Sequence, residues 1–290
     1  MADFIEKTAI VTGGASGIGK ELCLALGDGG AMVVVTDIDI DGAEAVAEAI
    51  RSRGGKASAF RADVSRQGDI QNVIEKTKED YGGLDYLFNN AGVHIFGEFK
   101  DMPHDDWKKL LDINLWGVIH GTTQAYEVML QQGHGHIVNT ASISGVYPSP
   151  FEVAYATTKF GVVGLSTSLR EEAKAYNIKI SVVCPSIVKT TMFENTQLLN
   201  IDREKLTASN AFKKAPSPKK AVRQILKGVM ADKAIIPVNP DAGFIWRLYR
   251  FAPSIALFFN TVKIKIGRKM VAESQKKSHL PMDWQARPLK

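Results

Sequence analysis

Short β-branched runs alternate with amphipathic segments along most of this chain, and that alternation limits the folds it can adopt. The first unit is a run at residues 8–12, a glycine-rich turn and a helical segment that starts at Lys20. Because strands joined through helices run parallel within one sheet, the pattern predicts a parallel sheet. The predicted strands are residues 8–12, 32–37, 56–61, 84–89, 135–140, 178–184 and 234–237.

The segments between these runs have helical periodicity, clearest at residues 42–53 and 67–81, where apolar side chains recur along one face. Residues 107–129 and 152–176 are also predicted to be helical. Several strand runs are apolar nearly throughout, as in sheets covered on both faces. We therefore expect an α/β fold with a Rossmann-like, doubly wound parallel sheet, in a single domain of residues 1–240 followed by a C-terminal extension of residues 241–290.

The net charge of +5 is concentrated near the C-terminus. Residues 1–240 contain 26 Lys and Arg against 28 Asp and Glu, a balance of −2, whereas residues 241–290 contain 10 against 3, a balance of +7. A body so close to neutral offers no basic groove, so we expect no nucleic-acid partner.

Within the extension, residues 243–270 combine large aromatic and aliphatic side chains with six basic ones. This composition is typical of a peripheral membrane segment. The longest apolar run, residues 251–259, is too short to span a bilayer and contains Pro253. The alternative interpretation is that the aromatic side chains cover a subunit interface or the mouth of a substrate site.

The N-terminus and the cysteines bear on location and on metals. Residues 1–7 lead directly into the first strand and leave no room for a signal peptide, so we expect a cytoplasmic protein, with membrane association through the extension left open. Cys23 and Cys184 lie far apart, without the spacing of a disulfide framework or a zinc site. No metal site is expected.

The glycine-rich turn after the first strand contains Gly13, Ser16, Gly17, Ile18 and Gly19. Glycines let the backbone approach a pyrophosphate, and the N–H groups and dipole of the following helix stabilise its charge. A glycine-rich turn alone is only a tight turn in many proteins. Its position between a strand and a helix favours a dinucleotide site.

Asp37 ends the second predicted strand, 18 residues beyond Gly19. A carboxylate at about this spacing accepts hydrogen bonds from the adenosine ribose and repels a 2′-phosphate. The neighbouring Ile38 is not basic, and neither is Ser16 in the turn. The sequence therefore favours NAD over NADP as the cofactor.

Tyr155 and Lys159 are four positions apart in a predicted helix, so both side chains are expected on one face. A tyrosine has an ordinary pKa of about 10 and is a poor base at neutral pH. A nearby ammonium and the positive charge of an oxidised nicotinamide favour the phenolate, so we expect Lys159 and the cofactor to lower the pKa of Tyr155 toward a useful range. Most isolated pairs at this spacing carry no function.

Six ordered motifs in residues 5–240 resemble the short-chain dehydrogenase/reductase family, in its compact, single-domain, NAD-dependent branch. In chain order, these motifs are residues 12–19, Asp63-Val64, residues 89–92, Asn114, Ser142 with Tyr155 and Lys159, and residues 185–190. Two positions depart from the family's pattern: Ser186 follows Pro185 where a glycine is usual, and Ala141 precedes Ser142 where a serine is frequent.

The resemblance implies a role for each motif. Tyr155 would exchange the proton, Ser142 would stabilise the substrate oxygen, Lys159 would bind the nicotinamide ribose, and Asn114 would hold a water that links Lys159 to solvent. Asp63 and Val64 would hold the adenine, and Asn90, Ala91 and Gly92 would close over the adenosine side. The remaining cofactor-binding residues would be Pro185, Val188 and Thr190, the last two at the nicotinamide carboxamide.

The expected substrate walls are mostly apolar: Val93, Ile95, Phe96, Ile143, Val146, Tyr147, Phe151, Met192 and Phe193. They indicate a hydrophobic alcohol or ketone of steroid, retinoid or long-chain type, although such residues also occur as core under a loop. A small-alcohol dehydrogenase, an acyl-type ketoreductase and a noncatalytic NAD-binding scaffold are the alternatives. His94 is a candidate substrate contact, residues 190–217 are a candidate lid, and the family resemblance implies a homodimer or homotetramer.

Overall fold

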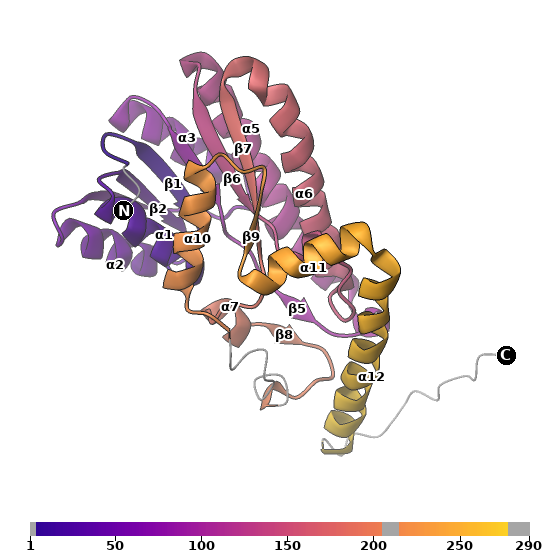
Figure 1. The fold of residues 1–290 in the computed structure, drawn as a ribbon. Coiled ribbons are helices and arrows are strands. Elements are labelled where there is room, and N and C mark those ends of the chain that lie inside the picture. Colours follow the sequence, from indigo (N-terminus) through magenta and orange to yellow (C-terminus); the bar gives the residue numbers. More distant parts are fainter. Residues whose placement is uncertain (1–3, 205–214, 278–290) are drawn as a thin grey trace.

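Seven parallel strands form one twisted sheet in the order β3-β2-β1-β4-β6-β7-β9 (Figure 1). The structure is a computed structural model that describes residues 4–204 and 215–277. It confirms the predicted doubly wound α/β fold. The strands are β1 (Thr8–Thr12), β2 (Met32–Asp37), β3 (Lys56–Arg61), β4 (Tyr86–Asn89), β6 (Gly135–Thr140), β7 (Ile178–Pro185) and β9 (Ile235–Val238).

Most strand bounds match the predicted ones, and the exceptions have local causes. The fourth strand starts at Tyr86 rather than at residue 84, because the backbone N–H and C=O of Leu84 pair with the side-chain amide of Gln132 at 3.2 and 2.6 Å. At the other edge, β7 extends to Pro185 and β9 to Val238, since these two residues are partners in the parallel register.

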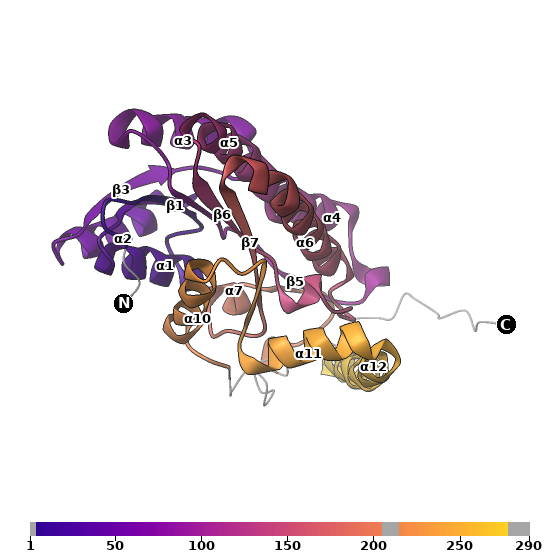
Figure 2. The same cartoon turned by 45° about the horizontal axis from the view of Figure 1, so that its top comes forward.

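Helices cover both faces of the sheet (Figure 2). One layer consists of α1 (Gly17–Asp28), α2 (Ile40–Arg51) and α10 (Pro218–Met230), and the other of α3 (Gln67–Tyr81), α5 (Gly117–Gln132) and α6 (Val153–Ala173). Alternate strand residues serve the two layers: Val33 and Val35 pack with the first, Val34 with the second. Burying apolar side chains on both faces drives this arrangement.

The predicted helix over residues 107–129 is wrong as a single element. The structure has α4 (His104–Leu111), a π-helical turn (Asp112–Trp116) and then α5. A π turn holds one more residue than an α turn, so it rotates the side chains within it. Here the turn brings Asn114 to Val93, whose N–H and C=O both bond the Asn114 side chain at 2.8 Å.

The predicted helix over residues 152–176 is α6 followed by a 3₁₀ turn (Lys174–Tyr176). The other short elements are β5 (Ile95–Phe96), which pairs with β8 (Gln197–Leu198), the 3₁₀ turns Phe99–Asp101 and Ile143–Gly145, and α7 (Thr191–Glu194). The candidate lid thus contains α7 and β8, while its residues 205–214 lie outside the described residues.

Two further helices, α11 (Pro240–Phe251) and α12 (Pro253–Lys277), follow β9 and pack on each other. In Figure 1, α12 runs away from the sheet on the side where β5 and β8 lie. Asn260 of α12 bonds the Tyr147 hydroxyl at 2.6 Å and the carbonyl oxygen of Pro148 at 2.8 Å. Among the described residues, no helix is both long and apolar enough to cross a membrane.

Strand β1 lies between β2 and β4, so the connections that leave β1 and β4 run in opposite directions. In open α/β sheets a ligand crevice opens at such a reversal, outside the carboxyl ends of the strands. The fold therefore directs attention to the loops after β1, β4, β6 and β7.

Candidate active site

The glycine-rich turn after β1 is packed so closely that side chains would not fit. Gly13 has a φ of 66°, and a Cβ on Gly19 would lie 1.9 Å from the carbonyl oxygen of Gly13. The Asn90 amide holds the turn by donating to the carbonyl oxygens of Thr12 and Gly13 at 3.1 and 3.3 Å. The loop after β4 thus supports a backbone cradle at the start of α1, the geometry that a diphosphate requires.

The carboxylate of Asp37, at the end of β2, lies beside this turn. It accepts from the backbone N–H of Ala15 at 3.0 Å and of Asp39 at 3.1 Å. Ile38, next to it, is exposed. An acceptor without a basic neighbour in sequence fits a ribose hydroxyl and opposes a phosphate at the same place.

The loop after β7 reaches the other side of the glycine turn. The Thr191 hydroxyl donates to Ser16 Oγ at 3.1 Å, and Gly17 lies so close to Thr190 that a Cβ would be 3.3 Å from the threonine Cβ. Pro185, the last residue of β7, and Val188 are buried. The structure therefore brings the first and last predicted cofactor-binding segments together.

Ser186, the departure from the family's Pro-Gly, has its hydroxyl engaged elsewhere. It accepts from the Asn239 amide at 2.9 Å and donates to Asp241 at 3.0 Å, both at the start of α11. The extra side chain thus attaches the loop after β7 to the C-terminal helices.

Asp63 and Val64 follow β3, further along the same edge of the sheet. The Asp63 carboxylate accepts from the backbone N–H and hydroxyl of Ser65 at 3.0 and 2.7 Å. Val64 is nearly buried and packs against Gly117. These contacts shape the edge where the resemblance puts the adenine.

Lys159 and Asn114 meet beside the backbone of Gly92. A Cβ on Gly92 would lie 3.0 Å from Asn114 Oδ1 and 3.7 Å from Lys159 Nζ. The Lys159 ammonium is buried and donates to the carbonyl oxygen of Thr140 at 3.0 Å. Burial lowers the pKa of Lys159 to about 8. Ala91, which precedes Gly92, is partly buried and packs against the core cluster that contains Leu87 of β4.

Tyr155 projects from the first turn of α6, and Lys159 follows one turn later, as the spacing predicts. The ammonium lies 5.5 Å from the centre of the phenol ring. Ser142, two residues after the end of β6, hydrogen-bonds the phenol, while its own oxygen also accepts from the N–H of Ser144 at 3.2 Å. The structure thus brings together Ser142, Tyr155 and Lys159, three of the four predicted catalytic side chains.

The pKa of Tyr155 moves opposite to the predicted direction. Burial raises it, the nearby Glu152 carboxylate raises it further, and the hydrogen bond from Ser142 lowers it only in part. Water that would solvate a phenolate is excluded, and this outweighs the cation one turn away. Tyr155 is therefore a protonated phenol at neutral pH.

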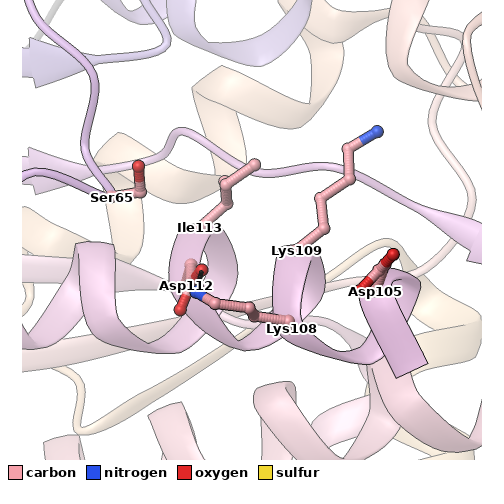
Figure 3. Close-up of a pocket in the computed structure, with 6 residues that line it drawn as sticks. All are labelled: Ser65, Asp105, Lys108, Lys109, Asp112 and Ile113. Carbon is pink, nitrogen blue, oxygen red and sulfur yellow. Dashed lines mark hydrogen bonds and ion pairs between the residues drawn. The ribbon is translucent and has the colours of Figure 1, made fainter.

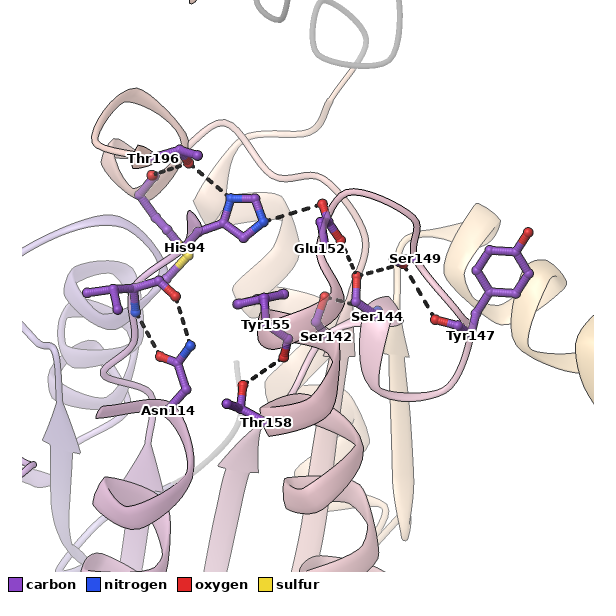
Figure 4. Close-up of polar contacts among 12 residues, drawn as sticks. His94, Asn114, Ser142, Ser144, Tyr147, Ser149, Glu152, Tyr155, Thr158 and Thr196 are labelled. Carbon is purple, nitrogen blue, oxygen red and sulfur yellow. Dashed lines mark hydrogen bonds and ion pairs between the residues drawn. The ribbon is translucent and has the colours of Figure 1, made fainter. Parts of the chain in front are cut away.

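A partly buried cluster of polar side chains lies beside Tyr155 and was not expected from the sequence (Figure 4). Glu152 accepts from the Ser144 hydroxyl at 2.7 Å and lies 3.3 Å from His94 Nε2, while His94 Nδ1 is 3.1 Å from the Thr196 hydroxyl. The imidazole packs edge-on against the Tyr155 ring at 4.6 Å between centres. His94 and Ser144 lower the pKa of Glu152 although burial acts against them.

This cluster joins three loops, after β4, after β6 and after α7. The only hint in the sequence is an acid three residues before the tyrosine, and a helix N-terminus commonly carries such an acid on its solvated side. His94, the candidate substrate contact, has protein partners on both ring nitrogens.

The predicted apolar walls divide among three clusters, one of which contains Val146 and Ile143 together with Val118 and Val182. Ile95 packs with Tyr155 in a cluster that also contains Leu110 and Ala154, edged by Val93, Met102, Trp107 and Leu199. Phe151 instead packs with Ile201 and Val271, and Phe96 stacks on it. Tyr147 and Phe151 are therefore core beneath α12, whereas Val93 and Ile95 remain beside the phenol.

A surface pocket of about 360 Å³ lies away from these side chains (Figure 3). It is lined by Ser65, Asp105, Lys108, Lys109, Asp112 and Ile113. No predicted catalytic residue contributes to it, and its Lys108–Asp112 ion pair is exposed, so we assign it no role.

Together, the backbone cradle, the ribose-type carboxylate and the Ser-Tyr-Lys group at the carboxyl edge of a parallel sheet define a dinucleotide-dependent oxidoreductase. Comparison with known proteins specifies the family. The family model for short chain dehydrogenases matches residues 7–199, and the chain belongs to the short-chain dehydrogenase/reductase family, whose members act on CH–OH and carbonyl groups.

Relatives and solved structures agree with this assignment. The chain is 33% identical to the 3-oxoacyl-[acyl-carrier-protein] reductase FabG of Thermotoga maritima over 65% of its own length and 76% of the relative's. It is 35% identical to the oxidoreductase UcpA of Salmonella typhimurium, over 67% and 74%. A family structure from Burkholderia phymatum, in complex with NAD, superposes with a TM-score of 0.78 at 25% identity, covering 88% and 96%.

Proposed function

We propose that this chain interconverts a hydrophobic primary or secondary alcohol and its carbonyl compound, with NAD(H) as the hydride carrier. The observation that carries the proposal is the buried phenol of Tyr155, which lies against Ser142 and Lys159 at the carboxyl edge of the sheet. The glycine cradle after β1 opens at the same edge.

Each side chain has a task that follows from its surroundings. Tyr155 is protonated at neutral pH, so a proton is available for the carbonyl oxygen as that oxygen gains negative charge during reduction. The Ser142 hydroxyl stabilises charge on the same oxygen. The buried ammonium of Lys159 would bind the nicotinamide ribose. The amide of Asn114 would hold a water that links Lys159 to solvent. When bound, the nicotinamide supplies or accepts the hydride.

The residues around the cradle fit NAD better than NADP. Asp37 would accept from ribose hydroxyls, and its charge opposes a 2′-phosphate. The Burkholderia phymatum relative, which was solved with NAD, supports the same choice. Turnover should therefore be much faster with NAD(H) than with NADP(H), and a strong NADP preference would contradict this part of the proposal.

The apolar surroundings of Tyr155 support a hydrophobic substrate. Val93, Met102 and Leu199 are only partly buried where they edge the tyrosine's cluster. Apolar surface left open beside a reacting group favours an apolar substituent on the substrate carbon. Steroids, retinoids and long-chain carbinols share that property.

A screen of NADH fluorescence over primary alcohols, secondary alcohols, hydroxysteroids, retinol and the matching carbonyl compounds tests the proposal. Tyr155→Phe should lower kcat by about 100-fold to 10,000-fold, because the proton donor is lost. The dinucleotide affinity should stay nearly unchanged, since one oxygen is removed. Tyr81→Phe, at the end of α3, is the matched control. A Tyr155→Phe enzyme that retains its turnover would overturn the assignment.

The likeness to a 3-oxoacyl reductase favours a second candidate, an acyl-type ketoreductase with the same catalytic groups. Turnover that depends on an acyl carrier rather than on hydrophobic chain length would select it, and a preference for short alcohols would select a small-alcohol dehydrogenase. Binding of NADH with no turnover of any substrate would indicate a noncatalytic scaffold.

We also propose that the chain forms a homodimer or homotetramer and contacts lipid through residues 243–270. Large apolar side chains are exposed on α6 and on the turn before α5, among them Trp116, Val153 and Phe160. Exposed apolar groups on neighbouring helices support self-association there. Light scattering on the purified protein measures the assembly.

A further inference from the structure

Many large apolar side chains of α11 and α12 point away from the protein. In α12, Ile255, Phe258, Phe259, Val262 and Ile266 are 56%, 68%, 53%, 46% and 56% exposed. Phe244 and Phe251 of α11 are 66% and 84% exposed. Soluble monomers rarely leave so many neighbouring apolar side chains in water, and such patches mark interaction sites.

The exposed residues of α12 follow one another at steps of one, three and four, so they form one continuous stripe along the helix. The buried positions of the same helix are Ala256, Asn260, Gly267 and Val271. An ordinary surface helix has the reverse arrangement, with large apolar residues inward and small or polar ones outward.

The rotation of α12 about its own axis is fixed, because the residues on its inner face have specific partners. Asn260 bonds Tyr147 and the carbonyl oxygen of Pro148, and the Tyr147 hydroxyl also donates to the Ala256 carbonyl at 2.9 Å. Gly267 lies directly on the Phe151 ring, where a Cβ would be 2.3 Å from the nearest ring atom. These contacts fix the apolar stripe toward the outside.

Basic side chains accompany the stripe. Arg247, Arg250, Lys265 and Lys269 are exposed, and Lys265 and Lys269 follow the stripe toward the C-terminal end of α12. Between residues 241 and 274 the acids are Asp241, which accepts from Ser186, and Glu273, 3.9 Å from Lys269. A second copy of this face would bring like charges together, whereas anionic lipid headgroups would complement them.

We propose that α11 and α12 dock this chain on an anionic lipid bilayer, with the stripe in the acyl boundary and the flanking bases at the headgroups. The geometry is that of an interfacial helix. Because no described helix is apolar enough to span a bilayer, the helices lie on the membrane and do not cross it.

Docking would bring the substrate site to the membrane. The inner face of α12 packs on residues 147–151, and Glu152, which follows directly, is the partly buried carboxylate beside Tyr155. A substrate dissolved in the bilayer would then enter without crossing water. This consequence rests on the proposed oxidoreductase activity, whereas docking itself, which specifies the lipid contact proposed above, does not.

Flotation of the full-length protein with vesicles tests docking independently of turnover. The protein should float with vesicles of phosphatidylcholine mixed with phosphatidylglycerol and remain behind with phosphatidylcholine alone, and high salt should weaken the binding. Phe258→Ser with Val262→Ser should reduce the bound fraction at least about tenfold, since two anchors are lost. The same pair of substitutions at exposed apolar residues elsewhere, Leu130→Ser with Met230→Ser, should change nothing.

Charge reversal provides the second arm. Lys265→Glu with Lys269→Glu should reduce binding at least about tenfold, because each base near the surface contributes. Lys219→Glu with Lys220→Glu on α10 changes the net charge equally and should leave binding intact. NADH binding and thermal unfolding report that each variant is folded.

Three results would overturn the proposal. The first is that the wild-type protein fails to float with anionic vesicles, and the second is that the stripe and charge variants float as well as the wild type. The third is that light scattering reveals an oligomer that dissociates on the Phe258 and Val262 substitutions, which would assign the face to a second copy of the chain. Lack of turnover on any substrate would contradict the proposed function and leave the docking result standing.

Discussion

Lys159 is a buried cation whose one hydrogen-bond acceptor among the described protein groups is the Thr140 carbonyl oxygen. Its pKa of about 8 lies below the ordinary value of 10.5 because burial penalises the charge. Between these two values the unfolded chain binds a proton that the folded chain gives up. This group therefore lowers the stability of the fold below pH 8, and stability recovers as the pH rises toward 10.5.

Lys159→Met should consequently raise the free energy of unfolding at pH 7 by about 1–3 kcal/mol while abolishing turnover. In the wild type, deprotonation of Lys159 raises the free energy of unfolding between about pH 8 and pH 10. The Lys159→Met variant should lack this rise. Urea unfolding at pH 7 and pH 10 measures both effects, with Lys227→Met on the surface of α10 as control. A variant less stable than the wild type at pH 7 would mean that the buried charge is fully compensated.

Glu152 gives Tyr155, the predicted catalytic tyrosine, a second electrostatic neighbour. Its carboxylate raises the pKa of Tyr155, after burial, which is the larger cause. Glu152→Gln keeps the shape and removes the charge, so the pKa of Tyr155 should fall. The pH at which alcohol oxidation becomes fast should move down, and carbonyl reduction should decline from a lower pH.

Profiles of kcat against pH for both directions test this effect. Glu172→Gln, on the exposed side of the same helix, removes the same charge far from the phenol and should leave the profile unmoved. If Glu152→Gln changes only the rates and not the pH dependence, the carboxylate has a purely structural role.

At the scale of elements, the π turn between α4 and α5 decides where Asn114 points. The turn directs the side chain at Val93, whose N–H and C=O it satisfies at 2.8 Å each. The β4 loop, with Gly92 and His94, is thereby tied to the helix layer. A short π turn inside a helix frequently marks a functional position, and here it lies beside the ammonium of Lys159.

Asn114→Leu keeps the branched shape and the number of side-chain heavy atoms but loses both hydrogen bonds. We expect it to cost about 1–3 kcal/mol of stability, because two backbone groups of Val93 are left without partners. Turnover should fall as well, since the loop that carries His94 loosens. Denaturant unfolding compared with Asn72→Leu, at an exposed site on α3, measures the cost. An unchanged midpoint would show that water replaces the amide.

At the scale of the whole molecule, a buried histidine in the sheet makes the fold sensitive to acid. His136 lies on β6, bonds Ser181 of β7 at 2.9 Å and is 4% exposed. Burial lowers its pKa to about 4, from an ordinary 6.5. As the pH falls from 6.5 toward 4, His136 takes up a proton in the unfolded chain but stays neutral in the folded chain. Stability is therefore lost in that pH window.

The loss through this group should reach about 3 kcal/mol. His136→Gln retains a donor to Ser181 and should lose most of this pH dependence. Unfolding at pH 6.5 and pH 4.5 gives the comparison, and His104→Gln, exposed at the start of α4, should behave as the wild type. An equal loss in wild type and His136→Gln would place the acid sensitivity in other groups.

The local part of this protein follows from its sequence. Runs of β-branched residues become strands, the glycines after β1 form a tight turn, and the four-residue spacing of Tyr155 and Lys159 brings both to one face of α6. These features depend on steric limits and on the period of a helix, which act between near neighbours in the chain.

Tertiary structure alone decided the rest. Glu152, His94 and Thr196 meet only because three loops converge at one edge of the sheet, and the environment created there raises the pKa of Tyr155 instead of lowering it. The outward stripe of α12 likewise follows from what Asn260 and Gly267 contact. Burial and contact between distant segments set these properties, and hydrophobic periodicity does not encode which segments will meet.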